Sequence, residues 1–159
     1  MLFATAGMKI EIGGQKSMKS VDFTEADFDA EDWTEITGHE NLGQLGDASE
    51  EITQELIGEA RMKRLKGTRS SPPMELILAI NYDDDGQQEI IAAEKTPNDY
   101  AFRLTFNDAP PDGTPSERMF IAKVASVTEQ FDTANNVMKL NATLWVNSNV
   151  VRVDATEAA

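Results

Sequence analysis

Apolar and polar residues alternate along three segments in the second half of the chain, which predicts β-strands there. Side chains two positions apart point to the same face of a strand, so each segment has one apolar and one polar face. The three segments are residues 74–82, 100–106 and 137–146. A further strand is predicted at residues 118–128, and the Asp-Thr-Ala-Asn-Asn at 132–136 that joins it to the strand at 137–146 favours a hairpin.

A short helix is predicted between the first two of these strands, at about residues 85–95. Aspartates at 83–85 offer helix N-caps, and Thr96-Pro97 ends the segment. A helix of roughly ten residues is too short to be stable alone, so we expect Ile90 and Ile91 to pack on a sheet. Residues 107–115 contain three prolines and a glycine and are expected to form a loop.

The first half of the chain predicts less regular structure. Met8, Ile10 and Ile12 alternate before Gly13-Gly14, which indicates an N-terminal strand at a sheet edge, and residues 33–37 favour a short extended segment. The whole pattern predicts a mainly β (α+β) fold: an antiparallel β-sandwich or half-barrel with one flanking α-helix.

The segment at about 47–73 has two interpretations. Asp47 and Glu50 resemble a capping box, and apolar residues approximate a helical stripe up to Lys66, which favours a helix. Gly58, Gly67 and the Ser-Ser-Pro-Pro at 70–73 favour a long loop or hairpin arm instead. The sequence leaves both open.

Charge is segregated along the chain. Residues 22–51 contain eleven Asp or Glu and no Lys or Arg. Five basic residues then follow with no acid among them: Arg61, Lys63, Arg64, Lys66 and Arg69. Blocks of opposite sign favour contact between surfaces, such as those of identical neighbours. The alternatives are a solvated or nucleic-acid-binding basic loop and a flexible, solubilising acidic segment.

The composition offers little material for catalysis or for cofactor binding. Cysteine is absent, and no nucleophile, P-loop or zinc-protease motif is present. The single histidine, His39, lies in a glycine-rich polar stretch and is expected to be an exposed loop residue. Asp83-Asp84-Asp85-Gly86 lacks the ligand spacing of a calcium loop, so a helix cap is the favoured interpretation. We expect no enzyme activity, cofactor or metal.

Length and overall charge set further expectations. The chain of 159 residues suits a single domain, 1–159, with an N-terminal strand or arm at 1–20 and a short tail at 154–159. Residues 1–7 lack a secretory pattern and no apolar run suits a membrane span, so we expect a product made in the cytoplasm. The net charge of −14 disfavours stable binding of nucleic acid over most of the surface.

The order of elements from about Met8 to Val153 resembles a known family. Its landmarks are 32–36 (DWTEI), 66–69 (KGTR), the strand at 74–82, 85–91 (DGQQEII), the strand at 100–106, 119–124 (MFIAKV) and 135–138 (NNVM) running into 144–146 (LWV). This pattern resembles the major tail tube protein of long, non-contractile-tailed bacteriophages of the lambda type. One departure is Asn147-Ser148-Asn149, where relatives often have a glycine, which leaves the end of the last strand open.

The resemblance implies a structural protein of the virion tail. Its copies would form hexameric rings, stacked into a tube that conducts duplex DNA without binding it, together with a tape-measure protein and tail-end proteins. Residues 47–73 would form an inter-ring loop, and the five basic residues, Arg61 to Arg69, are the candidate inter-subunit interface. A tube subunit of a contractile tail or secretion-type injection system is the alternative.

Two polar strand faces are candidates for the lumen or the outer wall of such a tube. One carries Arg103 and Thr105, and the other carries Lys139, Asn141 and Thr143. The sequence does not distinguish between them. Trp33 and Trp145 are expected to anchor the core or an interface.

Overall fold

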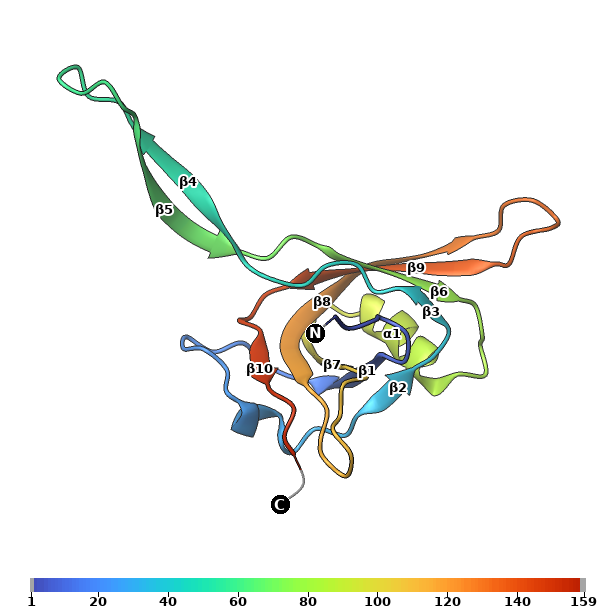
Figure 1. Cartoon of the computed structure of the whole chain (residues 1–159). Coiled ribbons are helices and arrows are strands. Elements are labelled where there is room, and N and C mark those ends of the chain that lie inside the picture. Colours follow the sequence, from blue (N-terminus) through green and yellow to red (C-terminus); the bar gives the residue numbers. More distant parts are fainter. Residues whose placement is uncertain (1, 158–159) are drawn as a thin grey trace.

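An antiparallel sheet of eight strands forms the body of the protein in the computed structural model, which describes residues 2–157. The strand order is β2-β1-β7-β8-β9-β6-β3, and β10 pairs with β8 (Figure 1). The bounds are β1 Lys9–Gln15, β2 Thr34–Ile36, β3 His39–Asn41, β6 Met74–Ala79, β7 Tyr100–Thr105, β8 Glu117–Gln130, β9 Lys139–Val146 and β10 Val151–Val153. The predicted mainly β fold is confirmed.

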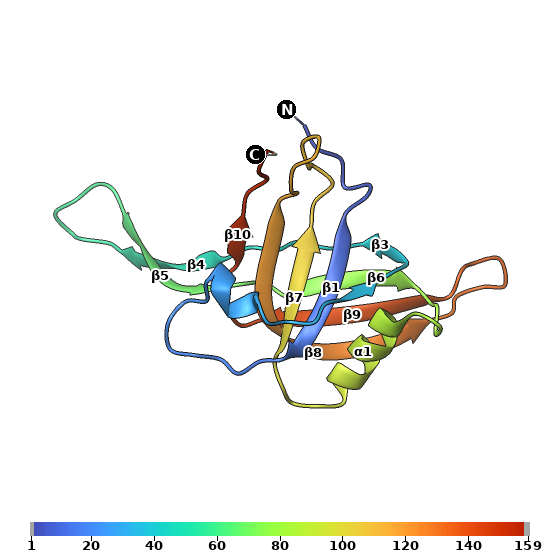
Figure 2. The ribbon, with the colours of Figure 1, turned by 90° about the horizontal axis from the view of Figure 1, so that it is seen from below.

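Strand β8 turns this sheet into a half-barrel. Its first half pairs with β7 up to Ala122, and its second half pairs with β9, with a register shift between Val124 and Ser126. A bulge of this kind bends a strand and increases its twist. In Figure 2, β1 and β7 therefore run across the direction of β6 and β9.

The main hydrophobic core lies inside the curve of this sheet. Phe102 and Phe120 stack at its centre with ring centroids 5.7 Å apart, and neither is exposed. Ile10, Leu78 and Leu140 bring side chains from three further strands. Helix α1, Asp85–Glu94, covers this core with Ile90 and Ala93. The predicted flanking helix and its packing on the sheet are confirmed.

The start of α1 is fixed by a cap and by close packing. Asp84 accepts a hydrogen bond from the Gln87 amide at 3.0 Å, so the helix-cap interpretation of the aspartate run is confirmed. A Cβ on Gly86 would lie 2.2 Å from the Glu35 carbonyl oxygen, which explains the glycine there. Buried Gln87 donates to the carbonyls of Thr37 and Ala79, tying α1 to β2 and β6.

The first half of the chain differs from expectation in two ways. Strand β1 does not lie at the sheet edge, because β2 pairs with its outer side. The acidic segment is also not a loose solubilising stretch. It contains a 3₁₀ turn, η1 Glu25–Phe28, and buries Phe23 and Phe28 in a second cluster behind β7 and β8. The two buried aromatic side chains, Phe23 and Phe28, hold the acidic segment on the sheet because each buries a large apolar surface.

His39 is also placed differently from the prediction. It begins strand β3, opposite Leu78 of β6, and is half-buried. Its Nε2 lies 2.8 Å from the Met8 carbonyl oxygen. The expectation of an exposed loop histidine was wrong because the register of β3 on β6 cannot be read from the polar sequence around it.

Residues 47–73 form a hairpin arm that projects from the body (Figure 1). Strands β4 Ala48–Gln54 and β5 Lys63–Ser70 pair with each other and with no other strand. The helical interpretation of this segment was wrong. An amphipathic helix of this length needs a core to cover its stripe, whereas Ile52 and Leu65 lie opposite each other in the hairpin and remain 50% and 65% exposed.

The C-terminal segment adds the short strand β10 to the first half of β8. After β10, Thr156 bridges back to Thr114 in the loop between β7 and β8. Thr156 lies in the segment expected as a tail at 154–159, of which residues 158 and 159 are outside the described part. Among residues 2–157, no helix is long and apolar enough to span a membrane.

Candidate functional site

The five basic residues singled out in the sequence all lie on the arm. Arg61 is in the tip, and the other four are on β5. Three of them pair within the arm: Lys63 with Glu59 at 3.0 Å, Arg64 with Glu51 at 3.0 Å, and Arg69 with Asp47 at 3.2 Å. Exposed pairs of this kind contribute at most about 1 kcal/mol each and exchange partners readily.

The arm as a whole carries no net charge. Residues 47–70 contain five acidic and five basic side chains, so the net charge of −14 resides entirely in the rest of the chain. A neutral projection on an acidic body is not repelled by the body of an identical neighbour. The arm is therefore the part of the surface best suited to approach a second copy.

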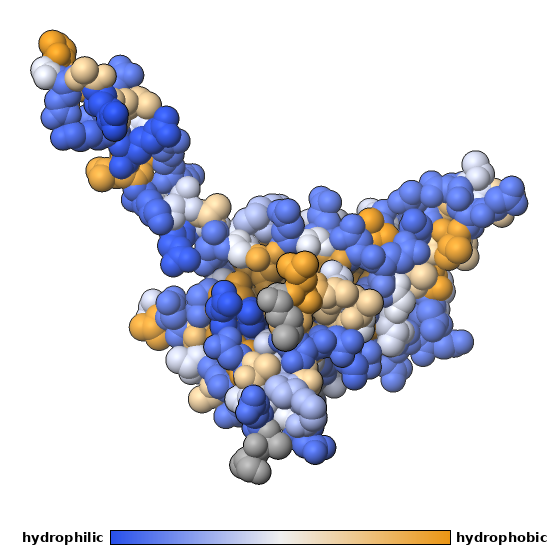
Figure 3. Space-filling view, in the orientation of Figure 1, coloured by the Kyte–Doolittle hydropathy of each residue, from blue (hydrophilic) through white to orange (hydrophobic). Residues whose placement is uncertain are grey.

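Exposed apolar side chains are concentrated on the same arm. In Figure 3, apolar groups lie at the outer end of the arm and partway along it, among hydrophilic ones. Ile57 at the tip is fully exposed, and Leu56 and Met62 beside it are 42% and 37% exposed. Scattered exposed apolar residues are common, but a cluster at the end of a projection indicates an interaction surface.

A groove of about 580 Å³ opens at the root of the arm. Asp47 and Arg69, the last charged pair of the arm, lie at its edge. Its apolar lining includes Leu42, Met74 and Leu104, which belong to the main core. The groove thus reaches the outer side of the core, where these three lining residues are themselves 8%, 1% and 5% exposed.

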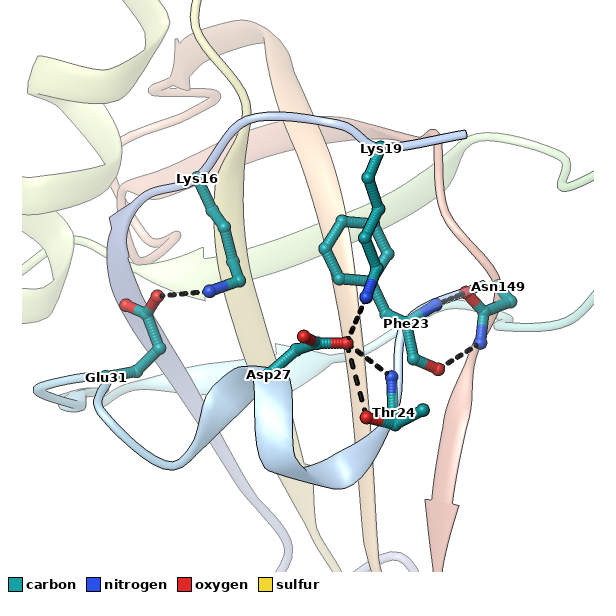
Figure 4. Close-up of polar contacts among 7 residues, drawn as sticks. All are labelled: Lys16, Lys19, Phe23, Thr24, Asp27, Glu31 and Asn149. Atoms are coloured by element: carbon teal, nitrogen blue, oxygen red, sulfur yellow. Dashed lines mark hydrogen bonds and ion pairs between the residues drawn. The ribbon is translucent and has the colours of Figure 1, made fainter. Parts of the chain in front are cut away.

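One wall of this groove is built by Asn149, in the Asn147-Ser148-Asn149 segment. The Asn149 side chain accepts a hydrogen bond from the Phe23 amide at 2.7 Å and donates to the Phe23 carbonyl at 3.0 Å (Figure 4). Neighbouring Ser148 accepts from the Ile121 amide at 2.8 Å. These polar side chains end β9 at Val146 and hold the chain entering β10, which a glycine would not do.

The segment around Phe23, which Asn149 holds, is also stabilised by hydrogen bonds to Asp27. Asp27 accepts hydrogen bonds from the Lys19 ammonium at 2.6 Å and from the Thr24 amide at 2.7 Å (Figure 4). The Lys19 hydrogen bond, followed by that of Thr24, lowers the pKa of the Asp27 carboxyl below its ordinary value. This arrangement closes the η1 turn and keeps Phe23 and Phe28 on the sheet.

The two polar strand faces differ in how far they are covered. Arg103 pairs with Glu11 at 2.6 Å and lies over the Trp33 ring at 4.8 Å, so the N-terminal segment covers part of that face. Trp33 is an anchor of the second cluster, as predicted for the core alternative. Trp145, by contrast, is 53% exposed, and its interface role stays a prediction.

The other polar face, on β6, β9 and the second half of β8, carries hydroxyl and amide side chains in register. Thr143 lies beside Ser126, and Asn141 beside Thr128. Both lysines on this face have acidic partners. Lys139 pairs with Glu40, and Lys123 pairs with Asp99, both at 3.2 Å.

Comparison with known proteins shows similarity of fold without close similarity of sequence. No family model matches the chain, and no curated protein matches it. A chain of the anti-feeding prophage baseplate, in a 6-fold symmetrised structure, has a TM-score of 0.70 at 9% identity, covering 97% of each chain. The SPP1 tail tube has a TM-score of 0.69 at 12% identity, covering 98% of this chain and 81% of that one.

An extracellular contractile injection system provides a third match. A chain of its PVC sheath-tube complex has a TM-score of 0.65 at 12% identity, covering 96% of this chain and 92% of that one. A phage tail tube and a contractile injection system are thus matched to a similar degree. The chain has the fold of the proteins that build phage tail tubes and the tubes of phage-like injection systems.

Proposed function

We propose that the protein is the structural subunit of a phage tail tube, of the long non-contractile type, and that it polymerises as stacked hexameric rings. The observation that carries the proposal is the match over 98% of the chain to the SPP1 tail tube. The 6-fold symmetrised assembly that contains another match supports the ring size. The role is structural rather than enzymatic, and the protein belongs to the virion tail after synthesis in the host cytoplasm.

The open face of β6, β9 and β8 is the proposed lining of the lumen. Duplex DNA must pass a tube wall without being held, and each basic side chain free to neutralise a phosphate would add attraction. The two lysines on this face are both engaged by carboxylates. Six copies carry six times −14, or −84, so the ring repels a polyanion overall.

The arm is the proposed link between rings. Rings of this charge repel one another, so stacking requires local complementarity. The basic side chains from Arg61 to Arg69 are proposed to exchange their partners within the arm for acidic groups on a subunit of the next ring. Tape-measure and tail-end proteins are the further partners implied for a tube of fixed length.

A tube subunit of a contractile tail or injection system is the second candidate. The matches to the anti-feeding prophage baseplate and to the PVC sheath-tube complex favour it. The two candidates differ in the outer wall, which in a contractile system contacts a sheath.

Electron microscopy of the purified protein at high concentration tests the proposal. We expect hollow filaments with regular axial striations, and a reconstruction with six subunits per ring and the β6–β9 face on the bore. A chain that forms neither rings nor filaments under these conditions would contradict the proposal. Filaments that bind a sheath protein from the same source would favour the second candidate.

A further inference from the structure

The groove at the root of the arm contains two neighbouring arginines that form no ion pair with an acidic side chain among residues 2–157. Arg118 of β8 and Arg152 of β10 are direct cross-strand neighbours, and both line the groove. Like charges at directly opposite positions destabilise a sheet. The Arg118 guanidinium also lies over the Phe106 ring, 4.6 Å from its centroid, so it is held in place at the groove wall.

This pair is unusual within the acidic body. Outside the arm the sequence has nine Lys or Arg residues. Five of them have a carboxylate within 4.0 Å: Lys16, Lys19, Arg103, Lys123 and Lys139. Among the described ion pairs the other four, Lys9, Lys95, Arg118 and Arg152, have none. Lys9 and Lys95 are single exposed side chains, whereas the two arginines are adjacent.

The pKa of Arg118 reflects its position beside Arg152. Burial, followed by the charge of Arg152, lowers the pKa of Arg118. Asp154 and Asp108 act in the opposite direction but form no ion pair with either arginine within residues 2–157. A carboxylate arriving from outside would therefore add attraction at an arginine pair that forms no ion pair within residues 2–157.

The arm tip has the chemistry that this groove would accept. Leu56 and Ile57 are exposed apolar side chains flanked by two acidic ones, Glu55 and Glu59, and Glu59 would exchange its exposed pair with Lys63 for a groove arginine. The groove is lined by Leu42 and Met74 beside the arginine pair. Its acidic lining residues are Asp22 and Asp47, and Asp47 is paired with Arg69, so the charged lining is basic by one charge. The tip of the same chain does not lie there, because the arm starts at the rim of the groove and extends away from it (Figure 1).

We propose that the groove formed by Leu42, Met74, Arg118 and Arg152 receives the arm tip, residues 55–59, of a second copy of this chain. Ile57 packs against Leu42 and Met74, and Glu55 and Glu59 meet the two arginines. The two surfaces in this contact are different, so it is heterologous, and repeating it links copies in an open series. The inference rests on the proposed function and adds the receiving site for the arm.

Disulfide trapping tests the contact, because the chain has no cysteine of its own. Chains carrying Ile57→Cys are mixed with chains carrying Leu45→Cys, which lines the groove, and are oxidised under assembly conditions. We expect covalent dimers from the mixture and a ladder of higher species when one chain carries both substitutions. The matched control replaces Leu45→Cys by Val137→Cys, an exposed position on the β8–β9 hairpin, and is expected to give neither. Equal yields from both pairs would overturn the proposal.

Charge exchange gives a second and independent test. Arg118→Glu with Arg152→Glu is expected to raise the protein concentration needed for assembly by about tenfold or more. Adding Glu55→Arg and Glu59→Arg to the same chain is expected to restore assembly, an outcome that a simple folding defect would not produce. Lys9→Glu with Lys95→Glu makes the same change in net charge and is expected to assemble normally.

The outcomes separate this inference from the proposed function. Unmodified protein that forms no tubes contradicts the proposed function. Unmodified protein that forms tubes, with Arg118→Glu/Arg152→Glu tubes forming equally well, contradicts only the assignment of the groove. The assignment of the groove is also contradicted if the chain with all four substitutions melts normally but does not assemble.

Discussion

The body and the arm of this protein are stabilised by different interactions. The body surrounds side chains such as Phe102 and Phe120, which are completely excluded from solvent. In the arm every residue of β4 and all but one of β5 are exposed, and the two strands are held by their antiparallel pairing and by the ion pair between Arg64 and Glu51. Burial of apolar surface is the dominant stabilising contribution in folding, so the arm has little stability of its own. It suits a segment that becomes buried only against another molecule.

The largest expected difference between the body and the arm is the loss of unfolding free energy when an apolar side chain is truncated. Phe120→Ala leaves a cavity beside Phe102 and is expected to lower the free energy of unfolding by about 3–5 kcal/mol. Leu65→Ala on the arm removes an exposed side chain and is expected to lower it by less than about 1 kcal/mol. Denaturant unfolding monitored by circular dichroism measures both. Similar losses would mean that the arm belongs to the cooperative core.

A pair of glycines offers the next contrast. A Cβ on Gly86 meets the backbone of Glu35 and Ile36, so Gly86→Ala must push α1 away from β2, at a cost of about 1–3 kcal/mol. A Cβ on Gly58 at the arm tip has no neighbour within 4 Å, so Gly58→Ala is expected to change stability by about 0.5 kcal/mol or less. Thermal melts of the two variants test this, and an equal decrease in Tm would contradict the packing described for α1.

Charge reversal on the arm is expected to separate folding from assembly. Lys63→Glu, Arg64→Glu and Lys66→Glu together disrupt exposed pairs with Glu59 and Glu51, each contributing at most about 1 kcal/mol. We therefore expect a folded monomer with a Tm close to that of the unmodified chain and no tubes by electron microscopy. Normal tubes from this variant would exclude the basic side chains from the interface.

The smallest expected effect concerns pH and is confined to the body. Asp108 accepts hydrogen bonds from the Ser116 hydroxyl at 2.6 Å and from its amide at 2.8 Å, and the hydroxyl bond is the main cause of the lowered pKa of this carboxyl. A carboxyl whose pKa is lower in the folded state stabilises that state above its ordinary pKa of 3.8, and the contribution is lost as pH falls below it.

Asp108→Asn is therefore expected to lower Tm slightly at neutral pH, with the difference from the unmodified chain disappearing at acidic pH. Melting curves recorded across the acidic range measure the effect. A difference that grows as pH falls would contradict the role assigned to this hydrogen bond.

The body was largely predictable from the sequence because burial leaves a periodic signal. Alternation located β6, β7 and β9, and the aspartates before α1 located its start. The bend of β8 was not predictable. Met119 to Ala122 are buried without alternation because the main core covers one face of the strand and the Phe23–Phe28 cluster covers the other.

The arm and the groove were predicted less well, for a physical reason. An exposed hairpin has no buried face, so its apolar residues fitted a helical stripe equally well. The basic residues of the arm were found from their sequence clustering. Arg118 and Arg152 were missed because their adjacency depends on the register of β10 on β8, and nothing in the sequence around either residue specifies that pairing. Asn149 was noticed only as a departure from the family pattern.

Amide hydrogen exchange tests most directly the claim that the arm becomes buried and stabilised against a second copy of the chain. In the unassembled chain, the amides of β4 and β5 are expected to exchange much faster than those of β7 and β9, because the arm opens without disturbing the core. In assembled tubes the account predicts that exchange in β4, β5 and the tip slows to the rates of the body. Tubes in which the arm exchanges as fast as in the unassembled chain would contradict it.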